Sequence, residues 1–400
     1  MSIIARRMAA IKPSPTMAIA GLALELKAAG RDVIGLAAGE PDFDTPDHVK
    51  RAACAAIEAG ETKSTAVDGT PALKEAVAAK FRRENGLDYR RDEISIAAGG
   101  THVIYNAMMA SLDPGDEVII PAPYWVSYPD IVLLAGGTPV FVACAEEDGF
   151  RMRPEDLARA ITPRTKWLIL NSPNNPTGAA YDADQLRALT EVLLAHPQVW
   201  LLSDDIYEHL LYDGLEFVTA AALEPRLRDR CLTMNGVAKA YAMTGWRIGY
   251  AGGPAELIRA MAKIQSQSTS NPCSISQAAA VVALQGPQDF MAERSRIFRE
   301  RRDMVVELLN QAPGLRCHRP EGAFYVYPSC AGVLGRRTPG GAALSSSEDF
   351  ARYLLEQEGV ALVPGAGFGI DPYVRISYAT SNELLLDACR RIVRACEALR

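Results

Sequence analysis

The chain has 400 residues, more than a single hydrophobic core usually organises, and 48% of them are hydrophobic and 22% charged. The formal net charge of −6 argues against nucleic acid or an anionic membrane surface as a partner. No stretch approaches the roughly 20 apolar residues that cross a bilayer. No apolar segment follows Arg6 and Arg7, as a secretion signal requires. We therefore expect a cytoplasmic globular protein of two domains.

The cysteines and histidines exclude two further classes of protein. The eight cysteines are scattered without a C-x-x-C pair, and the five histidines show no metal-ligand spacing. Reduced thiols are therefore expected in place of a disulfide framework, and no metal site is expected.

The N-terminal part of the chain predicts helices separated by turns. Residues 21–30 are typical of a short helix ended by glycine. Residues 46–60 and 71–85 have helical periodicity with charge on one side. Between these helices, residues 35–46 form a segment rich in turn-forming Gly, Pro and Asp.

Beyond this region, strand-like apolar runs alternate with helical stretches. Such alternation predicts βαβ units and an α/β fold with a mainly parallel central sheet covered by helices on both faces. The strand-like runs cover residues 93–97, 117–121, 140–143, 166–171, 199–203, 231–234 and 248–251. The helical stretches cover residues 101–112, 154–160 and 182–195.

The pattern changes after Gly253 to long helices and short strands, which is typical of a smaller α+β domain. We expect a large domain at residues 46–290, a small C-terminal domain at residues 291–400, and an N-terminal segment, residues 1–45, that packs with the small domain. The expected helices of the small part cover residues 287–310, 346–358 and 381–399, and its strands cover residues 323–327, 361–363 and 373–377.

Ligands of an open parallel sheet bind beyond the carboxyl ends of its strands, so the residues that follow the strand-like runs are the candidates for a site. Gly99, Gly100 and Thr101 follow the first run and open a helix, where backbone N–H groups favour an anion. Paired glycines also make an ordinary tight turn. The loop at residues 172–178, SPNNPTG, is a rigid turn or a place where an asparagine amide meets a bound oxygen.

Charged residues follow the later runs. Asp204 ends a buried strand, where a carboxylate is costly unless it meets a cation or a donor such as a pyridinium N–H, and Tyr207 follows it. Lys239 stands among small and apolar residues, which suit an amine nucleophile that forms a Schiff base. Arg247, further on, suits a phosphate. The plain alternatives are a solvated strand end for Asp204 and an exposed surface position for Lys239.

Six motifs, in one order along the chain, resemble a known family. GEPDFDTP, PYWVSYP, NSPNNPTG, SDDIYEHLLY, NGVAKAYAMTGWRIGY and VRISYATS are similar to those of the class I aminotransferases of pyridoxal-phosphate fold type I. The similarity is greatest to the bacterial subgroup containing aspartate and aspartate/prephenate aminotransferases, and it extends from about residue 12 to residue 380. It implies a fold type I transferase in which the large domain binds pyridoxal 5′-phosphate (PLP).

The resemblance implies a role for each motif residue at the cofactor. Lys239 would hold PLP as an aldimine and shuttle a proton between the substrate Cα and the cofactor C4′. Asp204 would pair with the pyridine nitrogen and keep the ring an electron sink. Tyr207 and Asn175 would donate to the phenolic oxygen of the ring, and Trp125 would stack on its face. The residues that would hold the phosphate are Gly99, Gly100, Thr101 and Arg247.

The resemblance also implies how substrates are bound. Arg375 would clamp the substrate α-carboxylate bidentately, helped by the backbone of Gly39, with Trp125 and Asn175 nearby. Lys12 is a candidate cation beside the substrate, although an exposed lysine is its plain interpretation. The implied partners are an amino acid and a 2-oxo acid, and the implied assembly is a homodimer whose active sites lie at the interface.

The sequence departs from the family pattern at a few positions. Ser64 stands where relatives commonly carry a tyrosine that reaches the neighbouring subunit's cofactor phosphate, so we expect weaker retention of PLP. Thr101 stands where some dicarboxylate-using relatives carry a lysine, which puts the preference for aspartate in doubt. Asp205 stands where relatives more often carry a glutamate, and this conservative replacement says little about the substrate.

Several functions remain open on the sequence alone. Transamination of aspartate, or of aspartate and prephenate, is the first hypothesis. An aminotransferase for aromatic or neutral amino acids and a PLP-dependent carbon–sulfur β-lyase share most of the motifs. An aminotransferase-like transcription regulator would need a DNA-binding module, for which too few residues precede Gly35.

Overall fold

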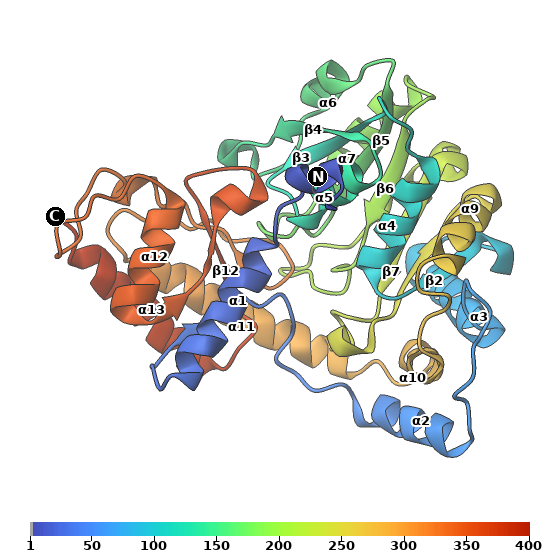
Figure 1. Cartoon of the computed structure of the whole chain (residues 1–400), viewed down its shortest axis with the longest axis horizontal. Coiled ribbons are helices and arrows are strands. Elements are labelled where there is room, and N and C mark those ends of the chain that lie inside the picture. Colours follow the sequence, from blue (N-terminus) through green and yellow to red (C-terminus); the bar gives the residue numbers. More distant parts are fainter. Residues whose placement is uncertain (1–2) are drawn as a thin grey trace.

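The computed structural model describes residues 3–400 and is built around a seven-stranded sheet (Figure 1). The order of its strands is β2-β8-β7-β6-β5-β3-β4. β8 is antiparallel to both neighbours, and the other neighbouring pairs are parallel. The expected α/β fold with a mainly parallel sheet is therefore confirmed. The strands are β2 (Ile94–Ala97), β3 (Glu117–Ala122), β4 (Thr138–Ala143), β5 (Thr165–Asn171), β6 (Trp200–Asp204), β7 (Cys231–Gly236) and β8 (Gly249–Gly252).

Both faces of this sheet are buried, because successive side chains of each strand enter different cores. In β5, Leu168 and Leu170 pack into one core and Trp167 and Ile169 into the other. The first core is covered by α2 (Asp47–Glu58), α3 (Pro71–Lys80), α6 (Pro154–Ala160), α7 (Ala183–Leu194), α8 (Ala220–Leu223) and α10 (Ser274–Gln285). The second is covered by α4 (Gly100–Ser111), α5 (Ser127–Leu134) and α9 (Ala255–Ser266).

The C-terminal part has a separate core and small sheets. β9 (Tyr325–Val326), β11 (Val363–Pro364) and β12 (Val374–Ser377) form one antiparallel sheet, and β1 (Ile34–Gly35) pairs in parallel with β10 (Val360–Ala361). Figure 1 shows α1 (Pro15–Ala28) beside these elements, and α11 (Phe290–Leu309) running along the base toward α12 (Ser347–Glu358) and α13 (Asn382–Glu397).

Some of the expected elements differ from the structure. The helix expected at residues 71–85 is α-helical only to Lys80, and residues 81–85 form a π-helical turn. The helix expected at residues 21–30 begins at Pro15, because the Ser14 side chain caps it and Pro15 has a backbone angle suited to a first turn. The strand expected at residues 361–363 is two short strands, β10 and β11, because they pair with different sheets.

The division into domains stays a proposal. The third core contains Phe298 and most of the buried hydrophobic residues that follow it, together with Ile34 and Leu36 of the N-terminal segment. α11 passes between cores, because Phe290 packs against the first core and Phe298 lies in the third. These contacts support boundaries near residues 45 and 290. Across residues 3–400, no helix combines the length and the apolar character that crossing a membrane requires.

Candidate active site

Lys239 lies in the loop that follows β7, partly buried and facing aromatic rings. Its Nζ donates to the Gly39 carbonyl at 2.5 Å and lies 5.6 Å from the centre of the Tyr207 ring. Burial, followed by the charge of Arg375, lowers the pKa of Lys239 to about 8. The side chain is therefore an amine that loses its proton more easily than a surface lysine, as a nucleophile requires.

Asp204 is the last residue of β6 and pairs in register with Asn171, the last residue of β5. Its Oδ2 accepts from the Tyr128 hydroxyl at 2.5 Å, and its Oδ1 accepts only a long 3.3 Å bond from the Ile206 amide. Burial raises the pKa of Asp204 to about 6. The carboxylate has no ion pair within residues 3–400, so a further N–H donor at Oδ1 would stabilise it.

Tyr207 lies three residues beyond Asp204 and meets a residue of the C-terminal part. The hydroxyls of Tyr207 and Tyr325 are 2.9 Å apart, and both side chains are buried. The backbone of Gly39 packs against the Tyr325 hydroxyl, because a Cβ at position 39 would lie only 3.2 Å from it. The pair therefore presents two phenol groups beside Lys239.

Arg375 lies in β12 and is 1% exposed. It donates to Asn175 Oδ1 at 2.9 Å and to the Ala37 carbonyl at 2.6 Å, but its Nε has no partner. None of the carboxylates in the described part of the chain forms an ion pair with it. A buried guanidinium without an anion is costly, so this geometry favours a carboxylate ligand.

The glycines after β2 form a cradle for an anion. Gly99 has a φ of +89° and precedes the first turn of α4. A Cβ at Gly99 would lie 2.3 Å from the guanidinium of Arg247, so only glycine lets this arginine approach the helix N-terminus. The free N–H groups at Gly100 and Thr101 and the charge of Arg247 converge there, as a phosphate requires.

The other predicted residues lie around these. Trp125 is partly buried, and its ring meets Tyr128 edge to face at 5.2 Å. Lys12 is exposed, and it lines an open cavity of about 660 Å³ together with Thr101 and Arg247. The backbone N–H of Lys12 donates to Asp130 at 3.2 Å.

Comparison with known proteins identifies the family. Residues 31–392 match the family described as aminotransferase class I and II. The chain belongs to this family. The aminotransferase is 61% identical over 399 residues, covering all of both chains, to the aspartate/prephenate aminotransferase of Cereibacter sphaeroides.

Solved structures agree with the match. The aspartate aminotransferase of Rhizobium meliloti superposes with a TM-score of 0.97 at 60% identity, covering 100% of both chains. That of Thermus thermophilus with maleate superposes with a TM-score of 0.92 at 47% identity, covering 99% of this chain and 100% of the other. The fold type I architecture and the transaminase class expected from the motifs are confirmed.

The enzyme uses PLP, as its family does. The geometry fits this cofactor at three of its polar groups. The cradle at Gly99 and Arg247 suits the phosphate, the open Oδ1 of Asp204 suits a ring N–H, and the amine of Lys239 suits the aldehyde carbon.

Some contacts of the site were not predicted from the sequence. Tyr128 lies in the PYWVSYP motif but was given no role, and it donates to Asp204. Asn171 accepts from the Asn175 amide and donates to the Asp204 carbonyl, and its place at a strand end was a usable signal. Tyr325 carried no signal, because it stands in an apolar run.

We expect the uptake of PLP by the apoprotein to depend on pH through Lys239. Only the neutral amine attacks an aldehyde, and its fraction rises about tenfold per pH unit below a pKa of about 8 and levels off above it. The uptake rate, followed by absorbance, should therefore rise between about pH 6 and pH 8 and then flatten. A rate that is independent of pH in this range would contradict the expectation.

Proposed function

We propose that this aminotransferase moves the amino group between aspartate and a 2-oxo acid, and that prephenate is among the oxo acids it accepts. The observation that carries the transfer of an amino group is the buried Arg375, a site for an amino-acid α-carboxylate, which lacks an anion and lies close enough to Lys239 to lower its pKa. The names of the aspartate and aspartate/prephenate aminotransferases at about 60% identity support the choice of substrate.

The residues of the chain divide the reaction between binding and proton transfer. Bound PLP supplies the electron sink that lets the substrate Cα lose its proton. Arg375 holds the α-carboxylate with two parallel hydrogen bonds, which orients the Cα–H bond toward Lys239. With PLP bound, the neutral amine of Lys239 would take the proton from Cα and return it on the cofactor side.

The remaining residues hold the ring in place. Asp204 would accept the ring N–H at Oδ1, while Tyr128 holds Oδ2. Tyr207 and the amide nitrogen of Asn175 would donate to the ring oxygen, since the carbonyl oxygen of Asn175 is already bonded to Arg375. Trp125 would cover the ring, and the phosphate would be held by Gly99, Gly100, Thr101 and Arg247.

Recognition of a second carboxylate falls to Lys12 in this proposal. Thr101 offers no charge, whereas Lys12 lines the same open cavity and is an exposed cation. The gain from an exposed ion pair is modest, about 1 kcal/mol. We therefore infer a preference for dicarboxylates rather than an absolute requirement.

A half-reaction screen tests the function. Single amino acids are added to the holoenzyme, and the change in cofactor absorbance is followed. Aspartate and glutamate should react faster than alanine and phenylalanine, and each should release its 2-oxo acid. A faster reaction of the neutral or aromatic amino acids would overturn the substrate assignment. Pyruvate, ammonia and thiol from cystathionine would favour a carbon–sulfur lyase instead.

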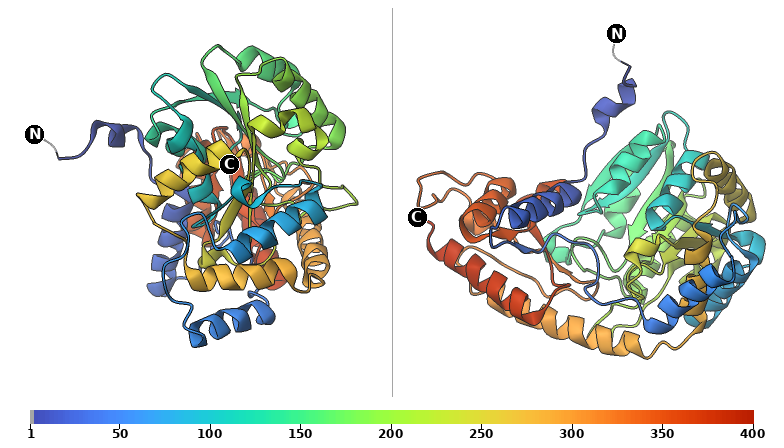
Figure 2. Two further views of the ribbon diagram at one scale, coloured as in Figure 1. Left: turned by 90° about the vertical axis from the view of Figure 1, so that its right-hand side faces the viewer. Right: turned by 60° about the horizontal axis from the view of Figure 1, so that its bottom comes forward.

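We also propose a cytoplasmic homodimer with active sites at the subunit interface. Figure 2 shows the N-terminal segment with η1 (Arg6–Ala10) projecting from the molecule, and η1 lies beside α5 but has no buried residue. Large apolar side chains are exposed in this region, including Ile3 at 98% and Met17 at 72%. Exposed apolar surface of this kind supports contact with a second copy.

A further inference from the structure

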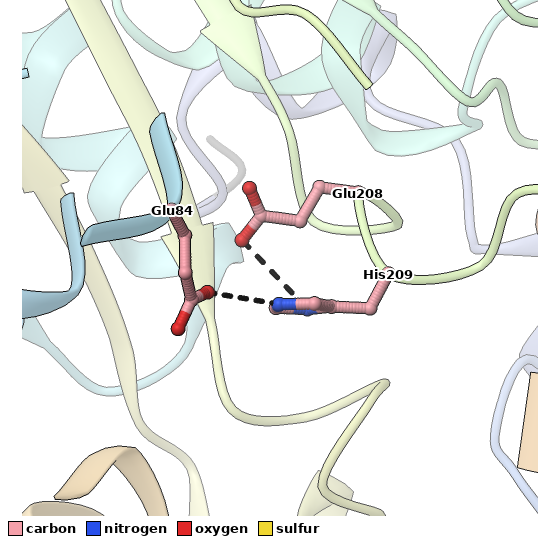
Figure 3. A group of neighbouring side chains, drawn as sticks. All are labelled: Glu84, Glu208 and His209. Carbon is pink, nitrogen blue, oxygen red and sulfur yellow. Dashed lines mark hydrogen bonds and ion pairs between the residues drawn. The ribbon is translucent and has the colours of Figure 1, made fainter. Parts of the chain in front are cut away.

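A cluster of charged side chains is centred on Glu208, the residue after Tyr207, and takes no part in the steps above. In Figure 3, Glu84, Glu208 and His209 lie together, with His209 Nε2 2.9 Å from Glu84 and Nδ1 3.7 Å from Glu208. The spacing resembles a set of metal ligands. However, the ammonium of Lys80 already contacts Glu208 and lies 3.6 Å from Glu84. Lys80 therefore supplies the cation, and the cluster does not suit a metal ion.

Glu208 is the centre of this cluster. Its carboxylate accepts from Lys80, from Asn85 Nδ2 at 2.6 Å and from Asn235 Nδ2 at 2.8 Å. Burial is the largest influence on the pKa of Glu208 and raises it, but the charges of Lys80 and His209 and the hydrogen bonds together hold this pKa below its ordinary value. A charged carboxylate is thus held by donors on both of its oxygens.

The three donors come from elements that flank the active site. Lys80 is the last residue of α3, and Asn85 ends η2 (Phe81–Asn85), a π-helical turn that follows it directly. The wider π turn lets Lys80 and Asn85 reach the same carboxylate. Asn235 lies in β7, four residues before Lys239. Glu208 therefore links the strand that leads to the lysine with α3 and η2.

Tyr207 and Glu208 are neighbours whose side chains make separate contacts. Tyr207 meets Tyr325 and lies under the amine of Lys239. The Glu208 carboxylate contacts the residues of the cluster, and the Glu208 backbone N–H donates to the Asp205 carbonyl at 3.0 Å. Fixing the Glu208 side chain therefore fixes the backbone from which the Tyr207 phenol projects.

We propose that Glu208 is a positioning residue for transamination: held by Lys80, Asn85 and Asn235, it fixes Tyr207 against the cofactor ring. This inference rests on the proposed contact of Tyr207 with the ring. Glu208 touches neither substrate nor cofactor, and no proton moves through it. Its effect is on geometry, because a misplaced phenol donates poorly to the ring oxygen.

The test compares Glu208→Gln with Glu117→Gln. Glu117 is also buried and is paired with Arg164, but it is the first residue of β3, at the amino end of the strand and away from the carboxyl ends that carry the site. Glu208→Gln should lower kcat about tenfold, weaken PLP binding, and change the circular dichroism of the bound cofactor. Glu117→Gln should lower the thermal midpoint while kcat stays within about twofold. Equal kcat values for the two variants would show that Glu208 is merely structural.

A double-mutant cycle with Tyr207→Phe then tests whether Glu208 acts through the Tyr207 hydroxyl. If Glu208 acts through the Tyr207 hydroxyl, Glu208→Gln should change kcat by less than about twofold in the Tyr207→Phe background. A full tenfold loss in that background would overturn the proposal. If Glu208→Gln does not fold, Asn85→Ala, which removes one donor to Glu208, replaces it in the same double-mutant cycle. The half-reaction of the unaltered enzyme with aspartate tests the proposed function independently of these variants.

Discussion

Replacing Lys239 with alanine should reduce the rate of the aspartate half-reaction by roughly 10⁴-fold or more. The substitution removes both the amine that attaches PLP and the base that moves the Cα proton. No other lysine is placed to replace it, because within residues 3–400 Lys239 is the lysine that faces both Tyr207 and Phe324. Stopped-flow absorbance of the PLP-loaded variant measures the rate.

Two control variants show whether the loss of rate comes from the missing amine, from the missing positive charge, or from a general loss of stability. Lys239→Arg keeps a positive charge but cannot act as a base, so it should be as inactive as the alanine variant. Lys50→Ala, which removes an exposed lysine of α2 paired with Asp47, should leave the rate unchanged. Native turnover in Lys239→Ala would refute the assigned site.

Replacing Arg375 with methionine should lower kcat/KM for aspartate about 10³-fold, or roughly 4 kcal/mol. The loss is large because the guanidinium is buried and the substrate carboxylate would enter the same dry space without a partner. The phosphate cradle is untouched, so affinity for PLP should change little. Steady-state kinetics and PLP titration measure the two quantities.

A matched pair of variants tests whether the effect is specific. Arg375→Lys keeps the charge but loses the two parallel bonds, so it should recover only part of kcat/KM. Arg302→Met removes another fully buried arginine, which is paired with Asp213 in the C-terminal part. It should lower stability without raising KM. A similar rise in KM in Arg302→Met would mean that the Arg375 result reflects packing alone.

The strands of the large sheet were predicted within a few residues because their apolar patterns are local, whereas α5, α9 and α10 were not predicted individually. β5 and β6 are runs buried on both faces, and their ends are marked by Asn171 and Asp204. The rule that ligands bind at the carboxyl ends of parallel strands then placed the candidate residues in one region. Arg375 was assigned to this region through its motif, VRISYATS, because its position within a strand gave no such indication.

The support of the site was not predictable, since it depends on contacts between distant residues. The hydroxyls of Tyr207 and Tyr325 meet across 118 positions of sequence, and Glu208 meets Lys80 across 128. No pattern near Tyr325 or Lys80 marks these partners. The register of the small sheets likewise decided where the strand expected at residues 361–363 divides.

By itself, the sequence determined the order of the elements and the chemical groups at the strand ends, because hydrophobic periodicity and motif spacing are properties of neighbouring residues. Only the tertiary structure decided that Arg375 is buried without an anion and that Glu208 is held by donors from α3, η2 and β7. The reason is that burial and pairing of charge depend on which distant segments pack together, and that is set by the whole fold.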